Sequence, residues 1–191
     1  MGAVIAAYGC VALCYVAFFS MPVSPAEPLD PVSFVIEDRE YSYFPRIHET
    51  IYTNGKAFVG IVTIRTVSAP NAAFSAAFDR LGGYAEDYAR EQYGVDIEVV
   101  VESSATDSDF SGHDAVRYKY GVLKEFTFGL PPLETTQDVK VAEIGAIAWF
   151  CNVDFESVVL FYVTPAYFVD DSSLEMLGVQ TMDLVEGVAC H

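Results

Sequence analysis

The spacing of hydrophobic positions changes several times along this chain, and each change marks a different predicted element. The first segment, residues 1–23, is apolar on every face and has no charged side chain from Ala3 to Val23. About 20 apolar residues in a helix are enough to cross the hydrocarbon core of a bilayer. A buried core helix would show a 3.6-residue amphipathic pattern and caps, which this segment lacks. We therefore expect residues 1–23 to be a hydrophobic membrane anchor or a secretory signal segment.

Two features of the apolar segment bear on that choice. A secretory signal has a cationic start, a shorter apolar stretch of about 7 to 15 residues, and small residues before the cut. No basic side chain precedes the segment, which favours a retained signal-anchor, whereas Ser24 and Ala26 offer small residues for cleavage before Glu27. All acidic and basic side chains lie beyond the segment. Either alternative predicts an extracytoplasmic domain, membrane-anchored or, after cleavage, secreted.

Proline then recurs at every third position, at 22, 25, 28 and 31. This spacing matches the three-residue turn of polyproline II, which forms semi-rigid spacers. Proline can neither continue a helix nor join the interior of a sheet. Residues 24–32 are therefore predicted to be an extended, largely unpacked linker that leads to a globular domain at 33–191.

Within this domain, strand and helix patterns follow one another. β-rich patterns predict a short strand stopped near Pro45, strands at 56–67, 95–103 and 113–123, and a central apolar hairpin at 141–151 and 157–165. In the strand at 113–123, Arg117 and Lys119 alternate with apolar residues, which indicates one more exposed face. Helical spacing predicts a helix at 72–93, kinked or close to the sheet near Gly82 and Gly83, and a closing helix with capping-box spacing from Ser172 to Glu175. The order favours an α+β fold, an antiparallel β-sheet flanked by helices.

Several of these segments together resemble the PsbP-like fold, a family of exported or lipid-anchored domains that includes an extrinsic lumenal protein of photosystem II. The resemblance is carried by the opening "YSYFPRI", the helix at 72–93, the strand start "SGHDAVRYKY", the hairpin "AIAWFC" and "VVLFYVTP", and the closing helix. It covers about residues 33–191 and consists of a pattern of elements without a catalytic signature. It implies an α/β/α sandwich with a non-enzymatic accessory or binding role, and it transfers no functional residues.

The net charge of the chain limits the classes of partner that it can bind. With 27 acidic and 10 basic side chains, the formal net charge is −17. Such a domain repels phosphate backbones, which excludes nucleic acid as a partner. We expect protein partners, membrane contact through the N-terminal helix, and a role as an extracytoplasmic subunit or assembly factor of a larger complex. The alternative is a pilin-like filament subunit with an apolar N-terminal helix and a β-rich head, although no basic leader precedes the apolar run.

One acidic segment, "DSDFSGHD", has the spacing of the first half of an EF-hand calcium loop. The twelfth position of that loop would be Tyr118, where an EF-hand needs a bidentate glutamate, so an EF-hand is excluded. A looser surface Ca²⁺ site formed by Asp107, Asp109 and Asp114 is one alternative, and a polar turn across residues 104–112 is the other. We expect no other cofactor and no catalytic residues, because no known catalytic or phosphate-binding motif is present.

The four cysteines fall into two groups. Cys10 and Cys14 lie in the apolar segment, and Cys151 and Cys190 lie in the domain. The spacing of the second pair excludes a zinc knuckle and a redox C-x-x-C motif. In an exported domain two such cysteines are expected to pair, so we predict a Cys151–Cys190 disulfide, with two unlinked buried thiols as the alternative.

Overall fold

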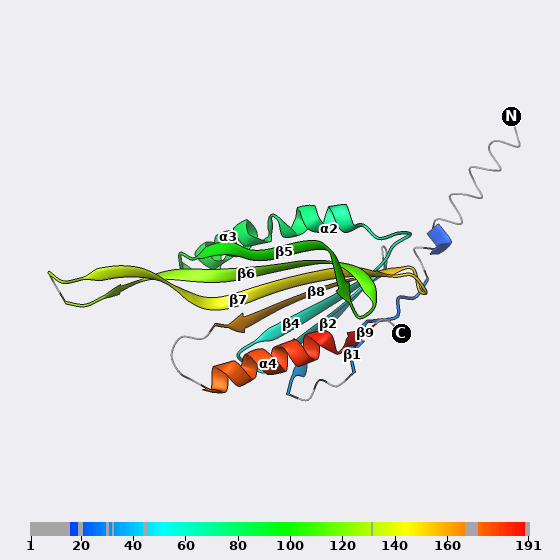
Figure 1. The fold of residues 1–191 in the computed structure, drawn as a ribbon. Coiled ribbons are helices and arrows are strands. Elements are labelled where there is room, and N and C mark those ends of the chain that lie inside the picture. Colours follow the sequence, from blue (N-terminus) through cyan, green and yellow to red (C-terminus); the bar gives the residue numbers. More distant parts are fainter. Residues whose placement is uncertain are drawn as a thin grey trace, which may run out of the picture.

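In the computed structural model, the residues described are 16–18, 21–29, 31, 33–43, 46–130, 132–166 and 172–189. The strands of the main sheet are β2 (Val35–Tyr43), β3 (Arg46–Thr53), β4 (Phe58–Arg65), β5 (Glu98–Phe110), β6 (His113–Phe128), β7 (Thr135–Cys151) and β8 (Glu156–Pro165). Their order is β2-β3-β4-β8-β7-β6-β5, and every neighbouring pair is antiparallel. The helices are α2 (Asn71–Phe78), α3 (Leu81–Tyr93) and α4 (Ser172–Glu186). The predicted α+β class with an antiparallel sheet is thus confirmed (Figure 1).

Helices lie on both faces of this sheet. Figure 1 shows α2 and α3 on one side and α4 on the other. Along β7, Ile147 and Trp149 belong to the buried cluster beneath α4, whereas Ala146 and Ala148 belong to the cluster beneath α2. Side chains of a strand alternate between the two faces, so both faces of β7 are covered from Gly145 to Trp149. The prediction that β7 and β8 form a central hairpin is confirmed. Burial on both faces holds for this part of β7, whereas residues 141–144 are only partly buried.

Two predicted boundaries on the sheet were wrong. The single short strand expected near Pro45 is a hairpin of β2 and β3, whose register runs from Val35 opposite Thr53 to Tyr43 opposite Arg46. The turn expected across residues 104–112 is confined to Ser111 and Gly112, which have φ angles of 52° and 78°. The polar residues before it continue β5, because two irregularities in register accommodate them in an exposed edge strand.

The long helix expected at 72–93 is divided into two. α2 ends at Phe78 and α3 begins at Leu81, so the break lies just before the two glycines and not at them. Gly82 instead allows a close approach to the sheet: a Cβ there would lie 3.3 Å from Cγ1 of Val99. The predicted close helix-to-sheet contact is therefore present, at the start of α3.

The described residues of the proline-rich segment form no helix, and the expectation that the segment is unpacked was wrong. Val23 and Ala26 are buried, and the backbone N–H of Ala26 donates to Oγ1 of Thr63 at 3.1 Å. The strand β1 (Glu27–Pro28) then pairs with β9 (Val188–Ala189) in a separate two-stranded sheet. The segment is part of the folded domain.

Most of the predicted anchor or signal segment, and Cys190 of the predicted disulfide, lie outside the described residues. Residues 16–18 form a short helical turn. Within the ranges that the structure describes, no helix is long and apolar enough to cross a membrane.

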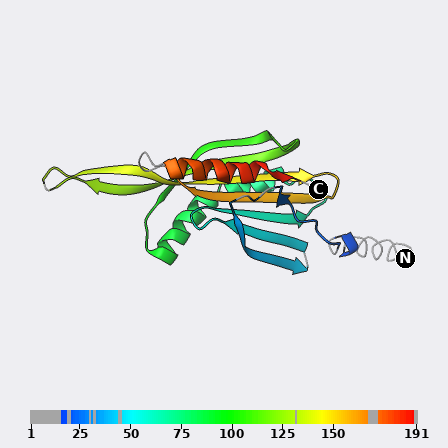
Figure 2. The same ribbon diagram turned by 90° about the horizontal axis from the view of Figure 1, so that it is seen from below.

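The β6–β7 hairpin extends well beyond the rest of the sheet. β5 pairs with β6 only as far as Leu123, and β8 pairs with β7 only from Ala142 onward. Residues 124–128 of β6 and 135–139 of β7 therefore pair only with each other. We call residues 124–139 the β6–β7 arm; Figures 1 and 2 show it projecting from one end of the molecule.

Candidate functional site

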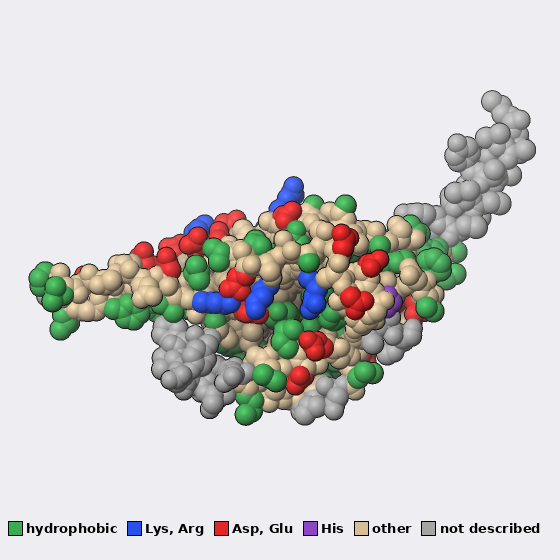
Figure 3. All heavy atoms as spheres, in the orientation of Figure 1, with side chains coloured by type: hydrophobic (Ala, Val, Ile, Leu, Met, Phe, Trp, Pro, Cys, Tyr) green, Lys and Arg blue, Asp and Glu red, His purple; other side chains and the backbone are tan. Residues whose placement is uncertain are grey.

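One half of the α4 face of the sheet has no helix over it. α4 packs along β8 and β4, and the same face of β5, β6 and the first half of β7 is left uncovered beside it (Figure 2). The result is a hollow of about 430 Å³, which we call the trough. Figure 3 shows Lys and Arg side chains gathered around a hollow in the middle of the molecule, with acidic side chains among and around them.

The trough stays open because small residues line it. β5 contributes Ser103, Ser104 and Ala105 to its wall. On the floor, Gly145 of β7 lies opposite Tyr162 of β8, and a Cβ at position 145 would be only 2.0 Å from the Tyr162 ring. The missing side chain therefore lets the ring lie flat across β7. A larger residue at position 145 would displace that ring.

Glu143 is the centre of a charge network on this floor. Its Oε2 is 2.8 Å from Nζ of Lys119 and 3.3 Å from Nζ of Lys140, and the hydroxyl of Tyr162 donates to its Oε1 at 3.3 Å. Lys140 also pairs with Glu102 at 2.6 Å. Two lysines are thus balanced by two carboxylates, and these four groups leave no net charge.

Protonation states in this network follow from burial and from these contacts. Burial raises the pKa of Tyr162 to about 12, and the neighbouring Glu143 carboxylate acts in the same direction. The phenol therefore stays a hydrogen-bond donor at neutral pH. Burial alone would lower the pKa of Lys140, but its hydrogen bonds to Glu102 and Glu143 outweigh that effect and raise it, so this lysine stays charged.

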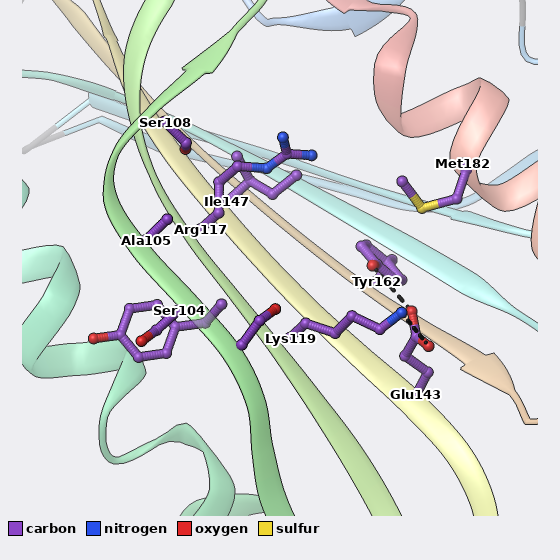
Figure 4. Close-up of a pocket in the computed structure, with 11 residues that line it drawn as sticks. Ser104, Ala105, Ser108, Arg117, Lys119, Glu143, Ile147, Tyr162 and Met182 are labelled. Carbon is purple, nitrogen blue, oxygen red and sulfur yellow. Dashed lines mark hydrogen bonds and ion pairs between the residues drawn. The ribbon is translucent and has the colours of Figure 1, made fainter.

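Arg117 is the remaining cation of the trough. Figure 4 places its side chain beside Ile147, with the guanidinium directed into the space between β6 and Met182 of α4. The guanidinium carbon lies 5.5 Å from the centroid of the Phe110 ring, a cation–π distance. Among the residues that the structure describes, no carboxylate lies within ion-pair distance of Arg117. The trough as a whole therefore carries one positive charge that its own residues leave available.

The predicted calcium ligands lie elsewhere, at the end of the β5–β6 hairpin. Asp109 and Asp114 are opposite each other in register, and Asp107 falls in the irregular stretch between Ala105 and Ser108. Across the described ranges, no group of three or more His, Cys, Asp or Glu side chains is placed to hold a metal ion. Cys151 is buried at the end of β7, and its pairing with Cys190, which lies outside those ranges, stays a prediction.

The β6–β7 arm carries the second notable surface. Leu130 and Leu133 at its tip are 80% and 82% exposed, and Phe128 beside them is 47% exposed. Figure 3 shows hydrophobic atoms gathered at the tip. The arm also bears Glu125, Glu134 and Asp138 against the single cation Lys124. Its surface is therefore apolar at the tip and acidic along the flanks.

The pattern of the sequence indicated part of this geometry. The alternation in β6 correctly marked Arg117 and Lys119 as lying on a more exposed face, but it gave no reason to connect them with Tyr162 or Met182. That connection depends on α4 covering only half of the sheet, which no local pattern encodes. Comparison with protein families, characterised proteins and solved structures finds no match for this chain.

Proposed function

We propose that this protein is a membrane-tethered or secreted accessory domain without enzymatic activity. It acts outside the cytoplasm as a subunit or assembly factor of a larger complex, on a PsbP-like α/β/α scaffold. Three observations support the proposal: the apolar segment at 1–23, the net charge of −17, and the seven-stranded antiparallel sheet with helices on both faces. The apolar segment supplies the membrane attachment, and the charge keeps the domain soluble beside it.

The observation that carries the interaction role is the β6–β7 arm. A two-stranded hairpin has too little core of its own to be stable alone, so an arm of this kind gains stability when a partner covers it. Large apolar side chains grouped on an exposed projection mark an interaction site. Leu130 and Leu133 at the tip are such a group. The acidic flanks select the partner: a protein with an apolar pocket bordered by basic side chains.

Site-specific photo-crosslinking in the native cells tests this role. A photoreactive amino acid is placed at Leu133 and, as a matched control, at Val153 in the β7–β8 turn, which is also 82% exposed. We expect the chain to form an adduct of one defined mass with another protein from position 133 and none from position 153. Leu130→Asp, which adds a charge to the exposed tip, is expected to abolish the adduct.

The other outcomes have distinct meanings. Adducts to lipid only, equal adducts from positions 133 and 153, or none from either would contradict the proposal. A ladder at multiples of the chain's own mass would favour the pilin-like filament alternative. In that case position 133 would lie in the contact between subunits.

A further inference from the structure

Arg117 is the residue that indicates a ligand site in the trough. In a chain with 27 acidic side chains, a half-buried arginine is expected to have a carboxylate partner. Arg117 has an aromatic ring beneath it and, within the described residues, no ion-pair partner. The planar guanidinium presents parallel N–H donors that fit a carboxylate bidentately. A group that binds this guanidinium would therefore be anionic.

The other side chains and the volume of the trough indicate the size and polarity of the molecule that would fit there. Ile147, Met182 and the ring of Tyr162 supply an apolar surface next to the guanidinium (Figure 4). A volume of about 430 Å³ falls within the range of small-molecule sites, roughly 300 to 1,000 Å³. The ligand is then a small molecule that has an apolar body as well as its charge.

The charge network limits the ligand to a single negative charge. Lys119 and Lys140 already share Glu143, so they offer little to a second anionic group. The carboxylate of Glu143 would also repel such a group. On the opposite wall, the hydroxyl of Ser103, which lies opposite Lys119, makes no hydrogen bond to the described residues and remains available to a neutral polar group.

We infer that the trough is a binding site for a small organic monoanion, with its carboxylate on Arg117 and a flat apolar body against Tyr162, Ile147 and Met182. This site goes beyond the proposed interaction role and does not depend on it, because the arm contributes no residue to the trough. Arm variants and trough variants therefore test the two ideas separately.

The test is calorimetric titration of the full chain, held in nanodiscs, with 2-naphthoate and with 2-naphthalenemethanol. The two probes share the same ring system and differ in the negative charge. Titration of empty nanodiscs gives the background for each probe. We expect 2-naphthoate to bind at least about tenfold more tightly than the alcohol, and we expect Arg117→Gln to reduce this ratio to about twofold or less. Arg117→Lys is expected to keep part of the preference, since the charge remains without the bidentate fork.

Two further variants keep the test decisive if Arg117→Gln folds poorly. Ser103→Phe, at an exposed position opposite Lys119 on the trough side of the sheet, fills the wall of the trough and should weaken both probes. Arg80→Gln removes an exposed cation between α2 and α3, away from the trough, and should change neither. Millimolar 2-naphthoate without detectable binding, or binding unchanged by Arg117→Gln and Ser103→Phe, would overturn the inference. Displacement of 2-naphthoate by equimolar inorganic phosphate would also overturn it, because that result would indicate a site for charge alone.

Discussion

Arg65 and Glu156 lie opposite each other on β4 and β8 and form a buried ion pair, with 2.9 Å between Nη2 and Oε1. Their side chains are only 10% and 3% exposed. The same guanidinium donates to the backbone oxygens of Pro22 and Asp154, and the same carboxylate accepts the backbone N–H of Ser24 at 3.0 Å. One ion pair thus connects the N-terminal segment to two central strands.

Glu156→Gln is expected to cost about 3 to 5 kcal/mol of unfolding free energy, because it leaves the buried Arg65 charge without its partner. Urea unfolding followed by circular dichroism measures this loss. Glu27→Gln is the matched control: its pair with Arg39 has side chains 41% and 45% exposed, and such pairs contribute at most about 1 kcal/mol. Limited proteolysis near Ser24 should accelerate in Glu156→Gln alone. Equal losses in the two variants would show that the buried pair has no special role.

Leu160→Ala and Ile147→Ala are each expected to cost about 2 to 5 kcal/mol, the range for removing a large side chain from a core. Both side chains belong to the buried cluster beneath α4. Val153→Ala, in an exposed turn, should stay within about 0.5 kcal/mol of the parent. Denaturant titration of the three variants checks the assignment. Losses below about 1 kcal/mol at both core positions would mean that the core lies elsewhere.

Gly145→Ala is expected to destabilise the domain by about 1 to 3 kcal/mol, because the new methyl group would overlap the Tyr162 ring. In a Tyr162→Ala background the same change should cost much less, so a double-mutant cycle measures the contact directly. Gly83→Ala in α3 has no neighbouring atom within 4 Å and should instead stabilise the helix by up to about 1 kcal/mol. Additive effects of the changes at positions 145 and 162 would contradict the described contact.

Alkaline pH provides a test of the buried phenol. The folded state raises the pKa of Tyr162 from 10.0 to about 12, so in this range the unfolded chain releases the proton first. The stability that the neutral phenol contributes is therefore complete below pH 10 and is lost as the pH rises through about 12. Unfolding free energies of the parent and of Tyr162→Phe, measured from pH 9 to the highest pH at which the parent stays folded, should converge or cross as the parent loses this contribution. A constant difference between the two proteins would show that Tyr162 titrates normally.

The Cys151–Cys190 disulfide is expected to stabilise the domain by roughly 3 to 4 kcal/mol through the loop of about 40 residues that it closes. Val188, near the end of the described chain, shares a buried cluster with Cys151, which is compatible with this pairing. Peptide mapping by mass spectrometry, with and without reduction, should find the two cysteines in one linked peptide pair. Alkylation of both residues in the unreduced protein would disprove the bond.

The sequence predicted an element correctly where the hydrophobic pattern within that element determined its structure. The continuous apolar runs of β7 and β8 identified the central hairpin, because a strand buried on both faces needs apolar residues at odd and even positions alike. The polar stretch from Ser104 to Asp109 was misassigned as a turn. Ser and Asp are common in turns, but an exposed edge strand with irregular register also accommodates them.

The candidate sites were harder to predict for a physical reason. The trough combines residues of three strands and a helix that are far apart in sequence, such as Arg117 and Met182. The packing of Val23 and Ala26 depends on contacts with β4 and β8, which proline spacing alone does not reveal. Local patterns report which face of an element is buried, and only the tertiary arrangement reports what lies opposite.

The pairing of β1 with β9 brings the beginning and the end of the described domain together, at the end of the molecule away from the β6–β7 arm (Figure 1). In a chain tethered through its first residues, this end acts as a pivot. The arm tip is then the point that sweeps the widest arc. The arm strands, residues 124–128 and 135–139, pair only with each other and add roughly 17 Å to that radius, at about 3.4 Å per residue. Under the proposed tether, the β1–β9 end would fix the position of the molecule, and the arm tip would sample the space around it.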